Sequence, residues 1–299
     1  MEPQFKSGYV AIIGEPNVGK STLLNALLQQ KLSIVTPKPQ TTRQRVLGIL
    51  STKTCQIIFL DTPGLLNPRY LLQKKMMLSA ELAINDADLI LVMTDLSHGL
   101  ELPEPVEQIL QRSRGIKECL LVINKIDIDD KKAALPMIDA FSQRNQFTEI
   151  IPISALKLEN LDDLLKTIER KLPEHPPYYP LDEISEQPER FFVAELIREK
   201  IFEMFWEEIP YSTAVEILEF KERAVGKTLI RADIIVERDS QKGILIGKRA
   251  EALKTLGEQA RGAIESFIQK PVFLELHVKV KEKWRENEAQ LKRLGYSPD

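Results

Sequence analysis

Gly-Glu-Pro-Asn-Val-Gly-Lys-Ser at residues 14–21 decides the fold of this chain, because it is a complete phosphate-binding loop of the form G-x-x-x-x-G-K-[ST]. Its two glycines let backbone N–H groups turn toward a phosphate, which a Cβ atom would obstruct. Lys20 can reach the β- and γ-phosphates, and the Ser21 hydroxyl is placed to bind Mg²⁺. A glycine turn that binds nothing is the alternative. The apolar strand pattern at 9–13 and the helical pattern at 22–28 favour the phosphate site.

Composition limits the class of protein. The chain has 299 residues, 43% hydrophobic and 28% charged, which is an ordinary globular balance and enough for about two domains. No apolar run approaches the roughly 18 residues of a membrane span, and the first strand begins too early for a secretory signal. Cys55 and Cys119 lie far apart, as expected of small core residues in a reducing cytoplasm. The net charge of −3 requires a local basic face for any polyanion partner.

Residues 1–172 alternate strand and helix patterns, which predicts an α/β domain with a mostly parallel sheet and helices on both faces. Ligands of such sheets bind beyond the carboxyl ends of the strands. The predicted strands are 9–13, 46–51, 55–60, 89–93, 118–123 and 149–153. The predicted helices are 21–29, 70–84, 104–113, 131–143 and 161–171.

A proline-rich stretch at 173–189 predicts an extended linker rather than a helix. A recognition peptide is the less favoured alternative. Residues 190–299 then read as a second, α+β domain. Its predicted helices are 191–206 and 249–268, and its predicted strands are 213–221, 228–237 and 272–280, with 223–226 joining the first two strands.

Three further motifs follow the phosphate loop in the order that a guanine nucleotide site requires. Asp61, in Asp-Thr-Pro-Gly, ends a strand and can hold Mg²⁺ through water, opposite Ser21. Asp127, in Asn-Lys-Ile-Asp, can accept hydrogen bonds from N1 and N2 of guanine, which adenine cannot donate. Thr42 is the favoured switch threonine over Thr41, with its hydroxyl joining Mg²⁺.

Together these motifs predict a GTPase. The expected catalytic residues are Lys20, Thr42, Asp61 and Gly64, and the expected metal ligands are Ser21, Thr42 and Asp61. The expected nucleotide-binding residues are Gly14, Glu15, Pro16, Asn17, Val18, Gly19, Lys20, Ser21, Thr22, Asp61, Thr62, Pro63, Gly64, Leu65, Asn124, Lys125, Ile126, Asp127, Ser154 and Ala155. Leu65 cannot hydrogen-bond an attacking water, so hydrolysis should be slow or assisted from elsewhere.

The second domain carries a basic glycine-containing segment at 241–250 that leads into a helix. Residues 241–283 hold nine Lys and Arg against five Glu, a concentration of cations in a chain that is negative overall. N–H groups and cations at such a turn suit a nucleic-acid backbone, although a solvated helix face would show the same charge. The expected RNA-binding residues are Gly243, Ile246, Gly247, Lys248, Arg249 and Lys254.

Over nearly its full length the chain resembles the Era family of bacterial GTPases. The resemblance rests on 14–21, Gln-Thr-Thr-Arg at 40–43, the Asp61 and Asn124 motifs, and a type II KH segment with Ile-Gly-Lys at 246–248. It continues through 274–281, Trp284 and Leu-Gly-Tyr at 294–296.

The resemblance implies a GTP-switched assembly factor for the small ribosomal subunit. Its KH domain would bind single-stranded RNA near the 3′ end of 16S rRNA, and its cofactors would be GTP or GDP with Mg²⁺. The resemblance also implies a cytoplasmic monomer with some peripheral association with the inner membrane. In some relatives the asparagine equivalent to Asn17 binds a monovalent cation, which makes K⁺ a further candidate.

One position departs from the family pattern. The KH loop usually reads Gly-x-x-Gly, but here Ala250 occupies the last position. Alanine is tolerated there if its φ is helical, although its Cβ would hinder a close approach by RNA. Two alternative functions stay open at this point: an RNA-binding scaffold that GTP only orders, and a membrane-associated signalling GTPase. The chain ends without a cysteine lipidation motif, which disfavours the second.

Overall fold

The computed structural model describes residues 5–128, 131–222 and 226–296. Backbone contacts divide the chain into two compact units. The first comprises residues 1–33, 42–68 and 76–186, and the second comprises residues 34–41, 69–75 and 187–299. The connection predicted at 223–226 lies, except for Gly226, outside the described residues.

The first unit is built on a six-stranded sheet in the order β2-β3-β1-β4-β5-β6. Only the edge pair β2 and β3 is antiparallel, and every other pair is parallel. Its strands are β1 (Lys6–Gly14), β2 (Val46–Ser51), β3 (Cys55–Asp61), β4 (Leu89–Asp95), β5 (Glu118–Asn124) and β6 (Glu149–Pro152). Its helices are α1 (Lys20–Leu28), α2 (Leu71–Asp86), α3 (Glu104–Ser113), α4 (Leu135–Gln143) and α5 (Leu161–Lys171), with 3₁₀ turns at η1 (Leu96–His98) and η2 (Lys131–Ala134).

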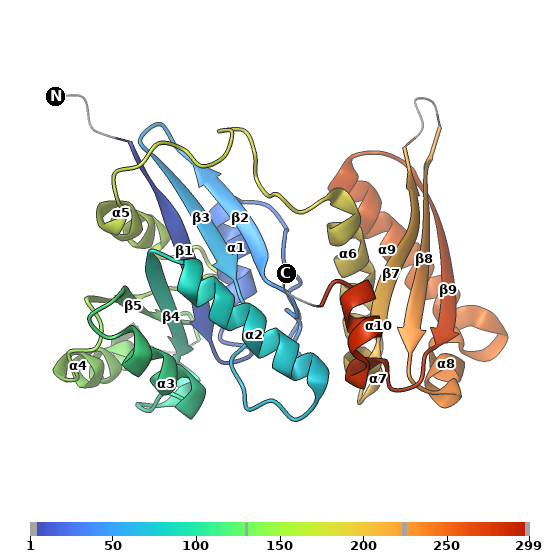
Figure 1. Cartoon of the computed structure of the whole chain (residues 1–299), viewed down its shortest axis with the longest axis horizontal. Coiled ribbons are helices and arrows are strands. Elements are labelled where there is room, and N and C mark those ends of the chain that lie inside the picture. Colours follow the sequence, from blue (N-terminus) through green and yellow to red (C-terminus); the bar gives the residue numbers. More distant parts are fainter. Residues whose placement is uncertain (1–4, 129–130, 223–225, 297–299) are drawn as a thin grey trace. The chain divides into compact units, whose positions relative to one another are not determined.

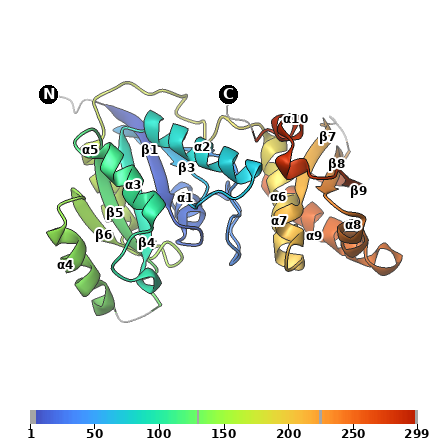
Figure 2. The ribbon, with the colours of Figure 1, turned by 60° about the horizontal axis from the view of Figure 1, so that its bottom comes forward.

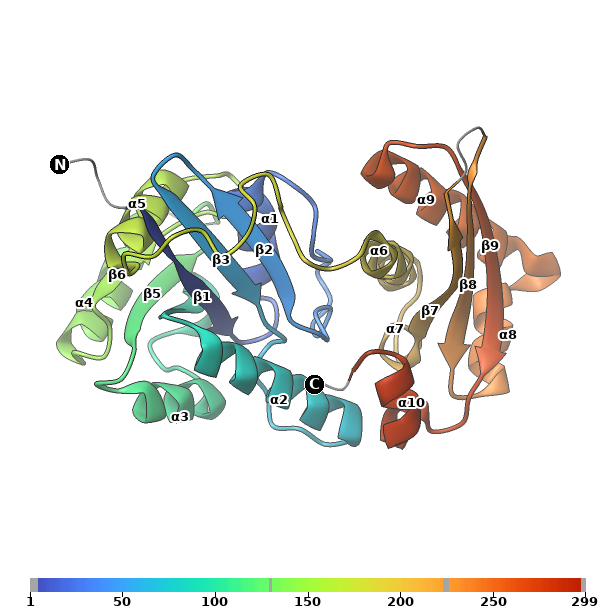
Figure 3. The ribbon, with the colours of Figure 1, turned by 45° about the horizontal axis from the view of Figure 1, so that its top comes forward.

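Helices cover both faces of this sheet, as the near-continuous apolar strands require. Residues of α2, α3 and α4 pack on one face against alternate side chains of β1, β4 and β5, such as Ile13, Val92 and Leu121. Figure 3 shows α1 and α5 on the other side of the strands from α2 and α3. Strands β3 and β4 are buried at every position, since both lie inside the sheet.

The proline-rich residues 173–186 belong to the first unit and lie along the edge of its sheet. The Ile49 N–H donates to the Ile184 carbonyl over 2.7 Å. The Gln56 side chain accepts from the Tyr179 N–H over 3.0 Å and donates to its carbonyl over 2.9 Å. Because β2 is an edge strand, the segment shields backbone groups that would otherwise be open to pairing.

The second unit has a three-stranded sheet in the order β7-β8-β9, with β7 antiparallel and β9 parallel to β8. Its strands are β7 (Ala214–Lys221), β8 (Thr228–Val236) and β9 (Val272–Val280). Its helices are α6 (Glu189–Met204), α7 (Ile209–Ser212), α8 (Asp239–Ile246), α9 (Glu251–Ile268) and α10 (Glu288–Arg293), with 3₁₀ turns at η3 (Lys248–Ala250) and η4 (Trp284–Glu286) (Figures 1 and 2).

The core of the second unit lies between this sheet and the helices α6, α8 and α9. Ile197 of α6, Ile264 of α9 and Ile234 of β8 are fully buried together. Trp284 is also fully buried, and its Nε1 donates to the Ser212 carbonyl over 2.8 Å. The C-terminal segment is therefore part of this fold rather than an appendage.

The structure adds the short helices α7 and α10, which were not predicted, and it corrects the sequence reading in two longer segments. Helix α8 was not predicted, because Gly243 was read as part of a turn, whereas it lies inside the helix. The helix predicted over 131–143 begins as the 3₁₀ turn η2 and becomes an α-helix only at Leu135, whose next residue is Pro136. Proline at the first helical turn is compatible with an α-helix because its missing N–H would have no partner there.

Candidate functional site

The phosphate loop connects the end of β1 to the start of α1, and its geometry admits only glycine at both ends. Gly14 has φ +150°, and a Cβ there would lie 2.3 Å from the Met93 carbonyl oxygen. Gly19 has φ +102°, and its Cβ would lie 2.2 Å from Asn124 Nδ2. The loop is thus pressed against the ends of β4 and β5, at Met93 and Asn124.

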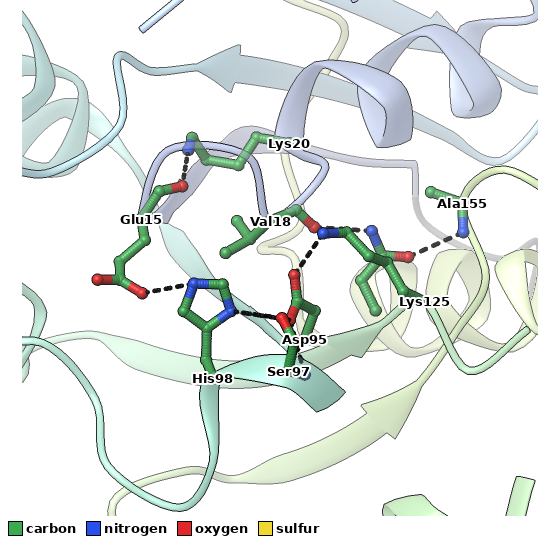
Figure 4. A network of polar contacts seen from close by, with 9 residues as sticks. Glu15, Val18, Lys20, Asp95, Ser97, His98, Lys125 and Ala155 are labelled. Atoms are coloured by element: carbon green, nitrogen blue, oxygen red, sulfur yellow. Dashed lines mark hydrogen bonds and ion pairs between the residues drawn. The ribbon is translucent and has the colours of Figure 1, made fainter. Parts of the chain in front are cut away.

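Lys20 is buried at the N-terminus of α1, with its ammonium inside the loop. Its Nζ donates to the Gly14 carbonyl over 3.1 Å and to the Glu15 carbonyl over 2.7 Å (Figure 4). Burial lowers the Lys20 pKa to about 8, although the charges of Asp61 and Glu15 oppose the shift. A bound polyphosphate would supply the negative charge that this buried cation lacks.

Three side chains that were expected to hold Mg²⁺ meet beside the loop. Ser21 Oγ donates to Asp61 Oδ2 over 2.8 Å and lies 2.9 Å from Thr42 Oγ1. Ser33, which the sequence reading missed, donates to the same Asp61 oxygen over 2.9 Å. Of the two threonines at 41 and 42, Thr42 thus joins the cluster, through its contact with Ser21.

Asp61 is the residue whose surroundings fit a metal ion. It is fully buried, and its Oδ1 has no hydrogen-bond partner among the described residues. Burial raises its pKa, against the opposing charge of Lys20 and the hydroxyl hydrogen bonds. A buried carboxylate oxygen without a partner is costly, and a divalent cation ligated there would remove that cost. Within the described chain no cluster of three His, Cys, Asp or Glu forms another metal site.

The turn after β3 is fixed to the phosphate loop by its backbone. A Cβ on Gly64 would lie 2.7 Å from the Pro16 nitrogen, so glycine is required for this approach. The Leu65 N–H donates to the Gly14 carbonyl over 3.0 Å, whereas the Leu65 side chain lies in the core with Ile13. Leu65 therefore turns its side chain away from the candidate phosphate site and cannot orient a water there.

Asn124 connects three loops at the ends of the strands. Its Nδ2 donates to the Val18 carbonyl over 2.8 Å, and its Oδ1 accepts from the Ala155 N–H over 3.0 Å. Ala155 was expected among the nucleotide-binding residues, and in this structure its N–H is engaged by Asn124. Asn124 thus ties the phosphate loop, the Asn-Lys-Ile-Asp loop and the Ser-Ala loop together.

The expected base reader lies at the same edge of the sheet. Ser154 Oγ donates to Asp127 Oδ1 over 2.5 Å, which orients that carboxylate. Lys125 has φ +64°, so the backbone bends sharply between the two polar residues of the motif. Ile126 and Val18 are buried, and their side chains contribute to the core rather than to a ligand surface. Of the remaining candidates, Thr22 lies in the first turn of α1, and Thr62 and Pro63 lie in the turn after β3.

A second polar cluster at this edge was missed in the sequence reading (Figure 4). It consists of Asp95 at the end of β4 with Ser97 and His98 in η1, and it contacts Glu15 and Lys125. A polar residue ending a buried strand is the signal that could have found Asp95. Nothing in the local pattern distinguishes His98 from a surface turn residue.

The candidate RNA-binding residues surround the loop between α8 and α9. Gly247 has φ +72°, and a Cβ there would lie 2.7 Å from the Ala252 Cβ. Lys248, Arg249 and Ala250 are exposed. Ala250 has φ +62°, so the helical φ under which alanine would be tolerated is not present. The other candidates lie in the flanking helices, Gly243 and Ile246 in α8 and Lys254 in α9.

Comparison with known proteins agrees with this geometry. Residues 9–125 match the family described as 50S ribosome-binding GTPase, and residues 208–285 match the KH domain. The chain is 46% identical over 299 residues to GTPase Era of Geotalea uraniireducens, covering 99% of each protein. The chain belongs to the Era family of GTPases. As an Era GTPase it is an enzyme that hydrolyses GTP, and the predicted fold class, a P-loop GTPase domain followed by a KH domain, is confirmed.

Two solved Era structures are similar to this chain over almost its whole length. A variant of Aquifex aeolicus Era bound to GDP·AlF4⁻ is 44% identical, with a TM-score of 0.94 over 98% of this chain and 100% of that one. An Era complex with MgGDPNP and nucleotides 1506–1542 of 16S ribosomal RNA has the same identity, coverage and TM-score. In the part of this Era chain that the structure describes, no helix is both long and apolar enough to span a bilayer.

Proposed function

We propose that this Era GTPase couples its nucleotide state to binding of 16S rRNA near its 3′ end during assembly of the small ribosomal subunit. The observation that carries the proposal is the buried Asp61, whose unpartnered Oδ1 sits beside the Ser21 and Thr42 hydroxyls next to a phosphate loop. One of the two similar Era structures contains MgGDPNP and nucleotides 1506–1542 of 16S rRNA, and the other contains GDP·AlF4⁻. The same ligands suit the residues of this chain.

Each loop has a definite role in this proposal. Lys20 neutralises charge on the phosphates, and Ser21, Thr42 and Asp61 hold Mg²⁺, which when bound withdraws charge from the β- and γ-phosphates. Asp127, oriented by Ser154, selects guanine by accepting hydrogen bonds from N1 and N2 of the base. The Leu65 side chain lies in the core and cannot orient an attacking water. Turnover is therefore slow without an activating group.

Thr42 provides the link to RNA binding. The neighbouring residues 34–41 and 69–75 are grouped with the second unit, whereas Thr42 and the phosphate loop belong to the first. A change in the Thr42 contacts on hydrolysis would therefore shift residues 34–41, which directly precede Thr42 in the chain. The KH loop, with Lys248 and Arg249 exposed, holds the backbone of single-stranded RNA.

The test uses the full chain and an RNA with the sequence of nucleotides 1506–1542 of 16S rRNA. We expect Mg²⁺-dependent multiple-turnover phosphate release that the RNA accelerates, and tighter RNA binding with a GTP analogue than with GDP. RNA affinity should fall steeply as salt rises. Equal RNA affinity in both nucleotide states would refute the coupling. RNA binding without turnover would instead favour a scaffold that GTP only orders.

Three finer parts of the proposal rest on resemblance to the Era family. They are a monomeric state, peripheral association with the inner membrane, and a K⁺ ion bound through Asn17. Light scattering, vesicle flotation and a comparison of phosphate release in K⁺ and Na⁺ buffers test them separately. Identical rates in K⁺ and Na⁺ would exclude the monovalent cation.

A further inference from the structure

Glu15 in the phosphate loop and Lys125 in the guanine-reading loop are joined by a chain of charged side chains (Figure 4). His98 Nε2 lies 2.9 Å from a Glu15 carboxylate oxygen, and His98 Nδ1 lies 2.8 Å from Asp95 Oδ1. Asp95 Oδ2 lies 2.5 Å from Lys125 Nζ. Charges therefore alternate from one loop to the other: negative, positive, negative, positive.

The arrangement requires both ring nitrogens of His98 to donate. An ionised carboxylate only accepts hydrogen bonds, and a neutral imidazole has a single N–H. A carboxylate oxygen lies within 2.9 Å of each ring nitrogen. In a neutral ring, the nitrogen without a proton would direct its lone pair at one of these oxygens. The geometry thus fits the imidazolium cation. The His98 and Glu15 side chains are 31% and 29% exposed, so the pair is partly shielded from solvent.

Asp95 is the fixed centre of the chain. It is fully buried, which by itself would raise its pKa, but hydrogen bonds from Lys125, Ser97 and His98 and the Lys125 charge hold the pKa at about 2. Asp95 is therefore charged at any physiological pH and always attracts its two cationic neighbours. The Ser97 N–H also donates to Asp95 Oδ1, over 2.9 Å, which fixes the carboxylate at the start of η1.

Both ends of the chain belong to the nucleotide site. The Glu15 carbonyl accepts from Lys20, so movement of Glu15 shifts the loop around that ammonium. Lys125 lies between Asn124 and Asp127, and its stem is available to pack along a purine. Asn124 joins the same two loops through the Val18 carbonyl. The charged chain is a second, independent connection between them.

We propose that His98 is a positioning residue of the nucleotide site: as a cation it ties Glu15 to Asp95, and so fixes the phosphate loop and Lys125 relative to each other. This inference rests on the proposed nucleotide site and goes beyond the motifs that define it. Loss of the His98 charge loosens both loops, so GDP and GTP lose affinity equally. In the described residues the charged groups in contact with His98 are Glu15 and Asp95, with Lys125 beyond Asp95.

The test measures the dissociation constant of a fluorescent GDP between pH 5.5 and 8 for the full chain and matched variants. We expect His98→Gln to weaken GDP binding about fivefold, because one charged pair is lost. His98→Gln should bind weakly at every pH, whereas His98→Arg, which keeps the charge, should bind tightly at every pH. His277→Gln, which removes an exposed histidine of β9, should follow the wild type.

A double-mutant cycle separates positioning from simple loss of fold. Glu15→Gln and His98→Gln should each weaken GDP binding, and the double variant should be little weaker than either. Additive effects, or a His98→Gln profile identical to the wild type, would overturn the inference. Circular dichroism and RNA binding show whether the variants fold. If the wild type itself fails to bind GDP, the proposed function fails instead, and the two failures are distinguishable.

Discussion

The two glycine-containing loops, 14–19 in the first unit and 247–250 in the second, accommodate positive backbone φ angles in different ways. In the phosphate loop such angles fall on glycine or asparagine, at Gly14, Asn17 and Gly19. In the KH loop such angles fall on Gly247 and also on Arg249, at φ +50°, and Ala250, at φ +62°. A left-handed L-residue costs roughly 1–2 kcal/mol, and asparagine less, so the second loop carries strain that the first avoids.

Their surroundings differ as well. A Cβ at Gly14 or Gly19 would overlap neighbouring atoms, so the phosphate loop is fixed by contacts on every side. Arg249 and Ala250 are exposed, and the KH loop has room for both side chains. We infer that close packing holds the shape of the phosphate loop, whereas the exposed KH loop carries backbone strain at Arg249 and Ala250.

The strongest way to break this comparison is Gly19→Ala. The new Cβ would displace the Asn124 amide, which ties the phosphate loop to the base-reading loops, and would occupy φ +102°. We expect GDP affinity to fall at least about 100-fold, equivalent to about 2.7 kcal/mol. Equilibrium titration with fluorescent GDP measures the loss.

Gly115→Ala is the matched control. Gly115 also has a left-handed φ, +74°, but a Cβ there meets nothing within 4 Å. This variant should lose a little stability and keep its GDP affinity. If both variants bound GDP equally well, the tight packing around Gly19 would have no role in holding the loop.

Asp127→Asn tests the base-reading loop, which lies at the same edge of the sheet as the phosphate loop. The amide that replaces the carboxylate can donate to the O2 of xanthine but cannot accept from both guanine donors. We expect preference to shift from GTP toward xanthosine triphosphate by about 100-fold, measured as the ratio of dissociation constants. Ser154→Ala removes the 2.5 Å hydrogen bond to Asp127 and the acceptor of the Lys157 N–H. It should weaken both nucleotides and leave their ratio near that of the wild type.

Much of the first unit could be predicted from its sequence, because burial of the strands inside the sheet produces the apolar sequence pattern. Buried parallel strands read as apolar runs, and the predicted strand 118–123 differs from β5 by only one residue. The candidate nucleotide-binding loops at the strand ends could be recognised, because glycine, lysine and aspartate at this fixed spacing seldom serve a function other than nucleotide binding. The roles of Asp95 and His98 could not be predicted, since their partners Glu15 and Lys125 are distant in sequence and meet only after the sheet forms.

The second unit was harder to predict from its sequence, for a related reason. Helix α8 contains Gly243 and is capped by Gly247, so this short segment has the composition of a turn. Its formation depends on Leu245 entering the core beside α9, a tertiary contact that no local pattern reports. The φ angle of Ala250 was likewise undecidable, because alanine usually indicates a helical backbone.

A smaller expected effect concerns protonation of the phosphate-loop lysine, Lys20, which is buried, unlike the KH-loop lysine, Lys248. Lys20 is buried with a pKa of about 8, whereas Lys248 is exposed. A bound phosphate restores the Lys20 charge and so raises its pKa, which means that nucleotide binding takes up protons rather than releasing them. At pH 8 about half a proton should be taken up per GDP, and close to none at pH 7. Calorimetry in two buffers of different ionisation enthalpy measures the uptake, and a heat at pH 8 independent of buffer would contradict it.

The smallest expected effect comes from Ala250→Gly, which removes the strain specific to the KH loop. Glycine adopts φ +62° without a Cβ penalty but gives the unfolded chain more freedom, so the net gain in unfolding free energy should be about 0.5–1 kcal/mol. RNA should also bind about threefold tighter, because the backbone can approach more closely. Gly262→Ala is the control: Gly262 lies inside α9 with nothing within 4 Å of a Cβ, so alanine should stabilise the helix by about 1 kcal/mol without changing RNA affinity. A gain in RNA affinity for both variants would mean that overall stability, and not relief of strain at Ala250, controls RNA binding.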